Sequence, residues 1–412
     1  MTPRARVVRA VAVLAALLAV AWFGATIWLR RQLEPIELRL LADVQAVLPQ
    51  RMVRTPHLLE GPGWFGDELP SALEDLHAPL SPLLGERPEV GKLRRAVTAG
   101  TAPWEQLPGP WAEALDAGHA GLQTLLLATR LEKGGIPEGL GVLGSPRDPL
   151  QEAWPLVRAA GKLAALEVAR LESEGAVPLA VRTCLDALAV SRELSASGAV
   201  LGRMVAVGWV RELFYPCARA LDRALPEQQR LAAAQLSLLR KAVPRFPELV
   251  RRDATGAQLQ LFGGVASEPT QVKLPVWVRE QRFGQASSGI TLAPVLRLKL
   301  LHAWLVWLRG IDRVTAAGED PQRVAAATVA AAQESDASWN ELARAAGPPA
   351  WPRLLATHLD GLRLLDLLGQ IARANEPETF TLRLESPPEG EPGEVSFRTR
   401  PREPAQDENP PR

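Results

Sequence analysis

Histidines and carboxylates that could hold a metal ion or activate a water molecule gather in one stretch of the chain, residues 51–87. Glu74 and His77 are three residues apart, so on a helix their side chains would face one way and could share a metal ion. A third ligand would have to come from elsewhere. The polar candidates of this stretch are His57, Asp67, Glu68, Glu74 and His77. Exposed side chains on a short helix explain the pattern more simply, so we predict no catalytic site, metal ion or cofactor.

The sequence patterns of common catalytic sites are absent or lie in the wrong context. No HExxH, GxSxG or GxxxxGK[ST] occurs. Gly139, Gly141 and Gly144 have the bare spacing of GxGxxG, but a predicted helix precedes them and Pro146 follows. A dinucleotide site needs a strand before the glycines and a helix after them, so we interpret this run as a turn-rich loop. Ser288 precedes a predicted helix, where a serine most simply acts as the N-cap.

Composition excludes several classes of protein. The 412 residues include 47 basic and 46 acidic side chains, for a net charge of +1, and 47% of them are hydrophobic. This balance excludes the basic surface of a general nucleic-acid-binding protein and argues against an acidic disordered chain. Two cysteines exclude a disulfide-rich scaffold and a four-cysteine zinc or iron–sulfur site. We expect no nucleic-acid partner.

The two cysteines lie on either side of a predicted helix break at Gly198. Cys184 comes 14 residues before that glycine and Cys217 comes 19 residues after it. In a straight antiparallel hairpin they would miss each other by about 7.5 Å along the axis, whereas a disulfide needs Cα atoms within about 7 Å. We therefore expect buried free thiols, and a disulfide helped by a bend at Pro216 is the alternative.

The N-terminus carries the clearest signal in the chain. Residues 10–29 contain no charged side chain, and arginines flank the run on both sides. At about 1.5 Å per residue this run spans about 30 Å, the thickness of the hydrocarbon core of a bilayer. Trp22 and Trp28 lie toward its far end, where an indole suits the membrane interface. We predict an uncleaved transmembrane anchor in residues 1–31.

A cleaved signal peptide is the alternative for this segment. Ala19 and Ala21 have the small-x-small spacing of a cleavage site, although the apolar run continues for eight residues beyond it. A short tail before a single span and a long domain after it favour an N-terminus inside the cell. We therefore expect a single-pass protein of the bacterial cell membrane with its main domain outside the cytoplasm. The 41 arginines against 6 lysines suggest a GC-rich bacterial genome.

Apolar residues recur at helical spacing through residues 148–375, which predicts an all-α body of helical hairpins. Its first helix begins with Asp148 as N-cap and Pro149 as the first residue, and it ends at Gly175. The further helices are expected at 177–196, 200–225, 226–243, 247–262, 290–317, 321–333, 336–346 and 350–374. A bundle and an irregular solenoid would both bury these apolar stripes.

The segments around this body have different patterns. Residues 32–50 are expected to form a helical stalk, and residues 51–147 a mixture of helix and loop. A short helix is expected there near 71–77, another at 88–99 and a longer one at 110–131. Only the C-terminal end has the alternation of β structure, and we predict a β-hairpin within 376–400 from strands at 379–385 and 394–399. Residues 401–412 are Pro-rich and charged, which predicts disorder.

One segment of the predicted body is both basic and rich in tryptophan. Its polar members are Arg297, Lys299, His302 and Arg309, and its apolar members are Leu296, Leu300, Trp304 and Trp307. The apolar members recur at the spacing of a core-facing helix, so we expect Trp304 and Trp307 in the core. Contact of this segment with a membrane surface is the alternative.

One hairpin of the body resembles a tetratricopeptide repeat, in which a glycine permits the tight turn and alanines let two helices approach closely. The residues that carry this resemblance are Ala164, Leu171, Gly175, Ala180, Cys184 and Ala187. Cys184 stands where the family has an aromatic residue, and Arg192 stands where it has a proline. The resemblance covers residues 164–192 and implies one paired-helix unit, for which an ordinary helical hairpin is the alternative.

The whole arrangement also resembles a class of bacterial membrane proteins that have an N-terminal anchor and a long Ala/Leu-rich helical body. This resemblance implies architecture and compartment, and it implies no activity. We expect a non-enzymatic, membrane-tethered helical scaffold that binds another protein or a peptide. A hydrolase with scattered residues around 51–87 and a carrier of lipids or small ligands are the alternatives.

Overall fold

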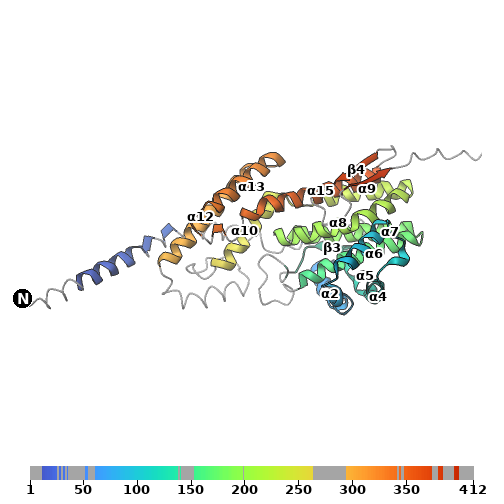
Figure 1. The fold of residues 1–412 in the computed structure, drawn as a ribbon, viewed down its shortest axis with the longest axis horizontal. Coiled ribbons are helices and arrows are strands. Elements are labelled where there is room, and N and C mark those ends of the chain that lie inside the picture. Colours follow the sequence, from blue (N-terminus) through green and yellow to red (C-terminus); the bar gives the residue numbers. More distant parts are fainter. Residues whose placement is uncertain are drawn as a thin grey trace, which may run out of the picture. The chain divides into compact units, whose positions relative to one another are not determined.

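The fold is that of a computed structural model of the chain, whose helices and strands are labelled in Figure 1. The structure describes residues 12–25, 27–28, 31–32, 35, 52–53, 61–137, 140, 153–197, 199–262, 294–340, 343–344, 348–373, 379–383 and 394–398. These residues are mostly helical, which confirms the all-α class predicted from the sequence.

Contacts within the chain divide it into two compact units. The first unit comprises residues 1–48, 141–147 and 245–356, and the second comprises residues 49–140, 148–244 and 357–412. The predicted segments follow the order of the chain, whereas these units join segments that are distant in sequence. Residues 245–356 of the predicted body 148–375 accordingly belong to the first unit and the rest to the second.

Three consecutive helices form the centre of the second unit: α6 (Trp154–Ser173), α7 (Val177–Ser197) and α8 (Ala199–Arg223). Each of them packs against the other two. The bounds of α7 and α8 confirm the helices predicted at 177–196 and 200–225. The predicted start of the first helix was wrong, because α6 begins at Trp154 with Ala153 at the N-cap position instead of at Pro149. Asp148 itself lies outside the described residues.

Glycines provide the turn and the close approach in this centre. α6 ends before Gly175, whose φ of +77° is left-handed, and the N–H of Ala176 donates to the carbonyl oxygen of Leu171. The chain therefore reverses at the residue predicted from the sequence. Gly161 of α6 lies against the indole of Trp209 on α8, which a Cβ would approach within 2.8 Å. The missing side chain lets the tryptophan pack directly on the backbone of α6.

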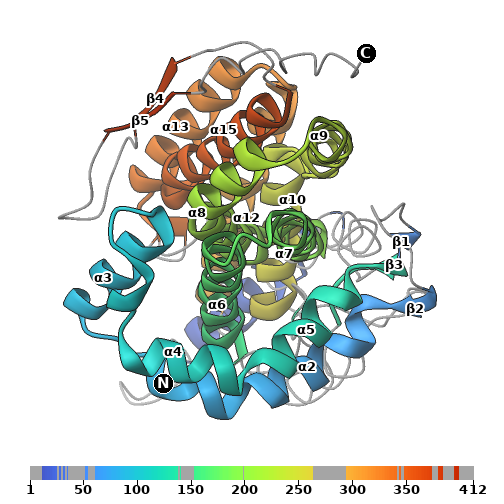
Figure 2. The same cartoon turned by 90° about the vertical axis from the view of Figure 1, so that its right-hand side faces the viewer.

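Helices of the preceding segment form an arc around this centre (Figure 2). They are α2 (Phe65–Leu80), α3 (Pro88–Ala99), α4 (Gly109–Ala117) and α5 (His119–Ala128), with the 3-10 turns η1 (Ser81–Leu83) and η2 (Trp104–Gln106). α2 and α4 pack on α6, α3 packs on α6 and α8, and α5 packs on α7. The core between these layers is apolar and includes Leu69, Leu76, Leu122, Leu163 and Phe214.

Two predictions for this arc need correction, while the helix at 88–99 is confirmed. The first helix is 16 residues long instead of the predicted 71–77, and it includes Pro70 and Pro79. The predicted helix 110–131 is divided at Gly118. A Cβ at Gly118 would come within 2.8 Å of the carbonyl oxygen of Ala114, so the close contacts there require a glycine.

A small three-stranded sheet also lies in this segment, so the prediction that only the C-terminal end is β was wrong. β1 (Met52–Val53) pairs antiparallel with β3 (Leu131–Gly134), and β3 pairs in parallel with β2 (Gly61–Trp64). Strands of two to four residues are too short to show an alternating pattern. A side chain also fixes the sheet, because the indole N–H of Trp64 donates to the carbonyl oxygen of Gly134 at 3.0 Å.

The second unit is completed by α9 (Pro226–Lys241), the later residues of α15 (Trp351–Arg373) and a two-stranded sheet. Leu364, Leu368 and Ile371 of α15 belong to the same core as α6–α8. β4 (Thr379–Arg383) and β5 (Glu394–Arg398) are antiparallel, with Phe380 opposite Phe397. The predicted β-hairpin is therefore confirmed.

The first unit contains α10 (Phe246–Phe262), α12 (Pro294–Ala316), α13 (Pro321–Asp336), η6 (Pro348–Ala350) and the start of α15. Its core includes Phe246, Val250, Ile311, Val314 and Trp351. These bounds confirm the helices predicted at 247–262, 290–317, 321–333 and 350–374. Asp320 caps α13 by accepting a hydrogen bond from the N–H of Gln322 at 2.9 Å.

The N-terminal residues 12–25 also form a helix. Among the described residues, none of the helices is long and apolar enough to cross a membrane. The helix predicted at 336–346 was wrong in its first part, because α13 ends at Asp336 and residues 337–340 form a non-helical connection. The predicted stalk at 32–50, apart from residues 32 and 35, and the tail 401–412 lie outside the described residues.

Candidate functional site

The predicted polar candidates of residues 51–87 do not assemble into a site among the described residues. Asp67, Glu68, Glu74 and His77 are exposed on α2, and His57 lies outside the described part of the chain. His77 lies 3.4 Å from the hydroxyl of Ser81. No group of three metal-ligating side chains occurs among the residues that the structure describes. Their spacing reflects the solvent-facing side of an amphipathic helix.

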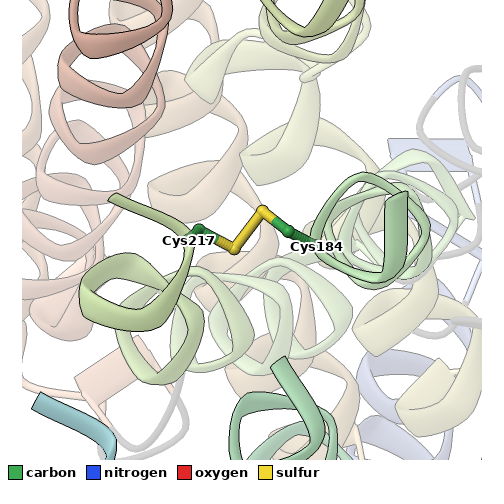
Figure 3. Close-up of a disulfide and its surroundings, with 2 residues drawn as sticks. All are labelled: Cys184 and Cys217. Carbon is green, nitrogen blue, oxygen red and sulfur yellow. A yellow bond between two sulfur atoms is a disulfide. The ribbon is translucent and has the colours of Figure 1, made fainter. Parts of the chain in front are cut away.

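The two cysteines form a disulfide, so the expectation of free thiols was wrong (Figure 3). Cys184 of α7 and Cys217 of α8 are fully buried, and their Cα atoms are 5.6 Å apart. The prediction assumed two straight helices of equal register on either side of Gly198. Pro216 lies inside α8 directly before the cysteine and removes one helical hydrogen bond. Pro216 was the signal in the sequence that favoured the alternative, a disulfide.

The N-terminal helix exposes all of its large apolar side chains. These side chains are 51–70% exposed within residues 12–25: Val13, Leu14, Leu17, Leu18, Val20, Trp22 and Phe23. A contiguous apolar surface of this kind is unusual on a folded protein in water and marks a contact with a membrane or a partner.

The basic, Trp-bearing segment on α12 has its tryptophans in the core. Trp304 and Trp307 are buried, and the indole N–H of Trp307 donates to the carbonyl oxygen of Ala343 at 3.2 Å. The core interpretation of these two residues is therefore confirmed. Trp339, which follows α13, is exposed and lies against the ring of His302 with ring centroids 4.9 Å apart. Trp339 falls inside the helix predicted at 336–346, but residues 337–340 are a non-helical connection, so its exposure was not predicted.

A buried charge network joins the arc of helices to the centre of the second unit. Arg94 of α3 is fully buried, and its Nη1 and Nη2 donate to the two carboxylate oxygens of Glu212 at 2.8 and 3.2 Å. Its Nε lies 3.7 Å from Glu86, which also pairs with Lys162 of α6. The indole of Trp111 donates to Glu86 at 3.0 Å, and its ring lies 5.1 Å from the guanidinium carbon of Arg94.

The charges of this network compensate one another. Desolvation lowers the pKa of Arg94, but the charges and hydrogen bonds of Glu212 and Glu86 outweigh it and raise that pKa. Desolvation likewise raises the pKa of Glu212, but Arg94, Lys162 and Arg95 outweigh it and lower that pKa. Both groups therefore stay ionised at neutral pH. A carboxylate held in this state is a poor general acid, so the network supports a structural clamp.

A second clamp joins the end of α5 to α7. Arg130 donates from Nε and Nη2 to the two oxygens of Asp186 at 3.0 and 2.6 Å. The carboxylate of Glu193 accepts from the N–H of Gly135 at 2.6 Å, where the backbone has a φ of +105°. These bonds fix the end of β3 on α7. Both buried carboxylates therefore accept hydrogen bonds from groups of the protein.

A third buried cluster contains an arginine whose hydrogen-bond acceptors are all neutral. Arg203 of α8 is fully buried, and its Nε donates to Nδ1 of His358 at 3.1 Å, while Nη1 donates to the hydroxyl of Ser195 at 3.2 Å. Nη2 donates to the carbonyl oxygen of His358 at 3.4 Å. No carboxylate among the described residues forms an ion pair with it. Desolvation, followed by the charge of Arg240, lowers the pKa of Arg203 to about 10.

His358 of α15 is a neutral acceptor in this cluster. Desolvation, followed by the charges of Arg203 and Arg240, lowers the pKa of His358 to about 3. Its Nδ1 accepts from Arg203, so the ring proton lies on Nε2. The sequence held one signal for this cluster, because Arg203 interrupts an apolar stripe of α8 between Val200 and Val207.

Comparisons with protein families, with curated proteins and with solved structures give no match for this chain. The described residues are mostly helical, and the buried clusters of Arg94, Arg130 and Arg203 join helices to one another. The most distinctive surface is apolar and lies on the N-terminal helix.

Proposed function

We propose that this protein is a membrane-tethered helical scaffold that binds another protein or a peptide. The observation that carries the proposal is the N-terminal helix, whose large apolar side chains are 51–70% exposed. Burying one such side chain contributes about 1.5–3 kcal/mol. A bilayer is the environment that would bury all sides of this helix at once.

The length of the apolar sequence supports a span. Residues 12–25 alone reach about 21 Å at about 1.5 Å per residue, less than the hydrocarbon core of about 30 Å. The uncharged sequence 10–29 supplies the remaining length if the helix continues through it. Arginines at both ends would then lie at the two headgroup layers.

The buried disulfide supports a location of the main domain outside the cytoplasm. Structural disulfides persist in oxidising compartments and are rare in the cytosol. Cys184 and Cys217 join the two central helices α7 and α8, so the bond belongs to the folded core. This agrees with an N-terminus inside the cell and the body on the other side of the bacterial membrane.

The scaffold role rests on the paired helices and on the state of the charged side chains. The hairpin of α6 and α7 has the left-handed glycine and the buried alanines that resemble a tetratricopeptide unit. The buried carboxylates of the described residues that form ion pairs are each held by an arginine or lysine. Such carboxylates position helices rather than transfer protons.

Membrane fractionation of the full chain tests the tether. We expect the protein to stay in the membrane pellet through alkaline carbonate and to leave it with detergent. The double variant Leu17→Arg/Leu18→Arg should move to the supernatant, because each arginine at the centre of a span costs about 3 kcal/mol. Leu231→Arg/Leu238→Arg on exposed α9 is the matched control and should stay in the pellet. Release of the unchanged chain by carbonate would contradict the tether.

Two further measurements test the compartment and the partner. Thiol alkylation of the unfolded, unreduced chain should find both cysteines blocked, whereas two free thiols would contradict the oxidising compartment. Chemical crosslinking in intact membranes, followed by purification in mild detergent, should capture a protein or peptide above the level seen with the carbonate-released variant. A chain recovered alone would contradict the scaffold role.

A further inference from the structure

The first unit exposes a compact apolar patch on α12 and the connection after α13. The patch consists of Leu298, His302 and Leu305 on one face of α12 and of Trp339, and we call it the Trp339 patch. Leu298 and Leu305 are 44% and 40% exposed, and Trp339 is 61% exposed. The spacing of three or four residues puts Leu298, His302 and Leu305 side by side on the helix.

The fold holds Trp339 in this exposed position. Its ring lies against His302 with centroids 4.9 Å apart. The next residue, Asn340, is buried and donates from Nδ2 to the carbonyl oxygen of Lys299 on α12. The hydroxyl of Ser338 accepts from the N–H of Asn340 at 3.1 Å. Both neighbours of the tryptophan are therefore fixed, and its exposure is a property of the rigid connection.

Three observations indicate what covers the patch. Contacts within the chain assign residues 1–48, which include the proposed anchor, to the same compact unit as α12 and α13. An exposed tryptophan beside leucines has the composition of a membrane interface, where an indole keeps its N–H in the headgroup layer. The nearby charges sum to an excess of positive charge, since Arg309 and Arg313 share the single carboxylate of Glu334. Lys299, the residue after Leu298, adds to this excess. Such a surface suits a headgroup layer, because the phosphate groups of the lipids are anionic even when the whole lipid is neutral.

We propose that the Trp339 patch lies in the headgroup layer of the bilayer that anchors the chain. The inference rests on the proposed membrane tether and adds a second contact to it. One span alone lets the body rotate freely about its linker, whereas a second contact fixes which face of the first unit meets the membrane. The contact gains from apolar burial and needs no anionic lipid.

Nitroxide labelling of the full chain tests this contact, because a single added cysteine is the only reactive thiol when Cys184 and Cys217 are paired. Leu305→Cys carries the probe in the patch, and Leu231→Cys on α9 is the matched control, since Leu231 is also exposed. Both proteins are reconstituted in phosphatidylcholine vesicles. The collision rates of each nitroxide are then measured in these vesicles with two reagents. Oxygen concentrates in lipid, whereas a polar nickel chelate stays in water.

We expect the ratio of oxygen to nickel collisions to rise severalfold at position 305 relative to position 231. Trp339→Ser in the Leu305→Cys background should bring that ratio back toward the control. Equal ratios at both positions in a protein that remains in the vesicles would overturn the patch contact and leave the tether intact. Low collision rates with both reagents at 305 would also overturn it, because they indicate a protein surface over the patch. A protein that does not enter the vesicles would overturn the tether itself.

Discussion

Arg94 and Arg203 are both fully buried in the second unit, but their partners differ in kind. Arg94 faces the carboxylates of Glu212 and Glu86, whereas Arg203 faces a neutral imidazole, a hydroxyl and a carbonyl oxygen. Burial lowers the pKa of both arginines, but the carboxylates outweigh it and raise the pKa of Arg94, whereas the pKa of Arg203 falls to about 10. Both guanidinium groups donate hydrogen bonds, but only the carboxylates around Arg94 compensate its charge.

The difference shows how each cluster serves the fold. The Arg94 network joins α3 to α6 and α8 through opposite charges, so loss of one charge leaves another buried without compensation. The Arg203 cluster joins α7, α8 and α15 through neutral acceptors, so it depends on close packing and on keeping His358 unprotonated. The following variants separate these two modes, with unfolding of the full chain measured in mild detergent.

The largest effect is expected for Glu212→Gln. This change leaves the Arg94 guanidinium buried with Glu86 as its remaining carboxylate at 3.7 Å. Breaking a buried ion pair costs about 3–5 kcal/mol of unfolding free energy. Because Glu86 still compensates part of the charge of Arg94, we expect a loss near the lower limit, at about 3 kcal/mol. The urea midpoint of the variant measures this loss. Glu334→Gln, whose arginine partners are exposed, should cost less than about 1 kcal/mol. Equal losses in both variants would contradict the role of burial.

An intermediate effect is expected for Gly361→Ala, next to the Arg203 cluster. A Cβ there would come within 2.6 Å of Val207 and 3.0 Å of Nη2 of Arg203. Overpacking of this kind typically costs about 1–3 kcal/mol, in spite of the better helix propensity of alanine. Thermal unfolding should show a lower midpoint. An unchanged midpoint would mean that the guanidinium has room to move, contrary to the packed cluster.

A smaller effect is expected from mild acid. The pKa of His358 is about 3 in the folded state and about 6.5 when unfolded, so below pH 6.5 only the unfolded state takes up the proton. His358 alone should therefore lower stability by about 1.5 kcal/mol between pH 6.5 and 5, and Asp253, whose pKa burial raises to about 6, offsets about 1 kcal/mol of that loss because only the folded state takes up its proton there. Relative to the unchanged chain, His358→Gln should be spared the His358 contribution of about 1.5 kcal/mol, whereas Glu212→Gln should keep the slope of the unchanged chain, because the pKa of Glu212 is lowered from its usual range. The same slope in His358→Gln would show that another group is responsible.

The smallest effect, with the opposite sign, is expected for Gly91→Ala in α3 near the Arg94 network. A Cβ at this position would meet Glu86 and Arg95 only at ordinary contact distances of 3.4 Å or more. Alanine should therefore stabilise the helix by about 0.5–1 kcal/mol. A small rise of the thermal midpoint would support the contrast with Gly361→Ala, and a fall would contradict it.

The sequence analysis predicted the elements that have a strong helical period. The bounds of α3, α7, α8, α9 and α10 agree with it closely, because apolar stripes and capping residues define both ends of a helix. The three-stranded sheet was missed since its strands are too short for a period. The disulfide was missed because counting residues from Gly198 does not fix the register of α7 and α8, which bring the two Cα atoms within 5.6 Å.

The buried clusters could not be predicted from spacing. Arg203 and His358 are 155 residues apart, and Arg94 and Glu212 are 118 residues apart. Only the packing of distant helices brings them together. An arginine on an apolar stripe signals that a partner must exist, but it does not identify that partner. Trp339 was missed for a similar reason, because its exposure depends on how Asn340 is bound to α12.

The N-terminus of the membrane-bound chain tests the tether most directly. The account predicts that the protein recovered from washed membranes retains residues 10–29, since these residues hold it in the bilayer. Intact-mass measurement and N-terminal sequencing of that fraction would establish where the mature chain begins. A first residue ahead of Ala10 would agree with the account, whereas a chain that begins at Trp22 would contradict it and indicate a cleaved signal peptide.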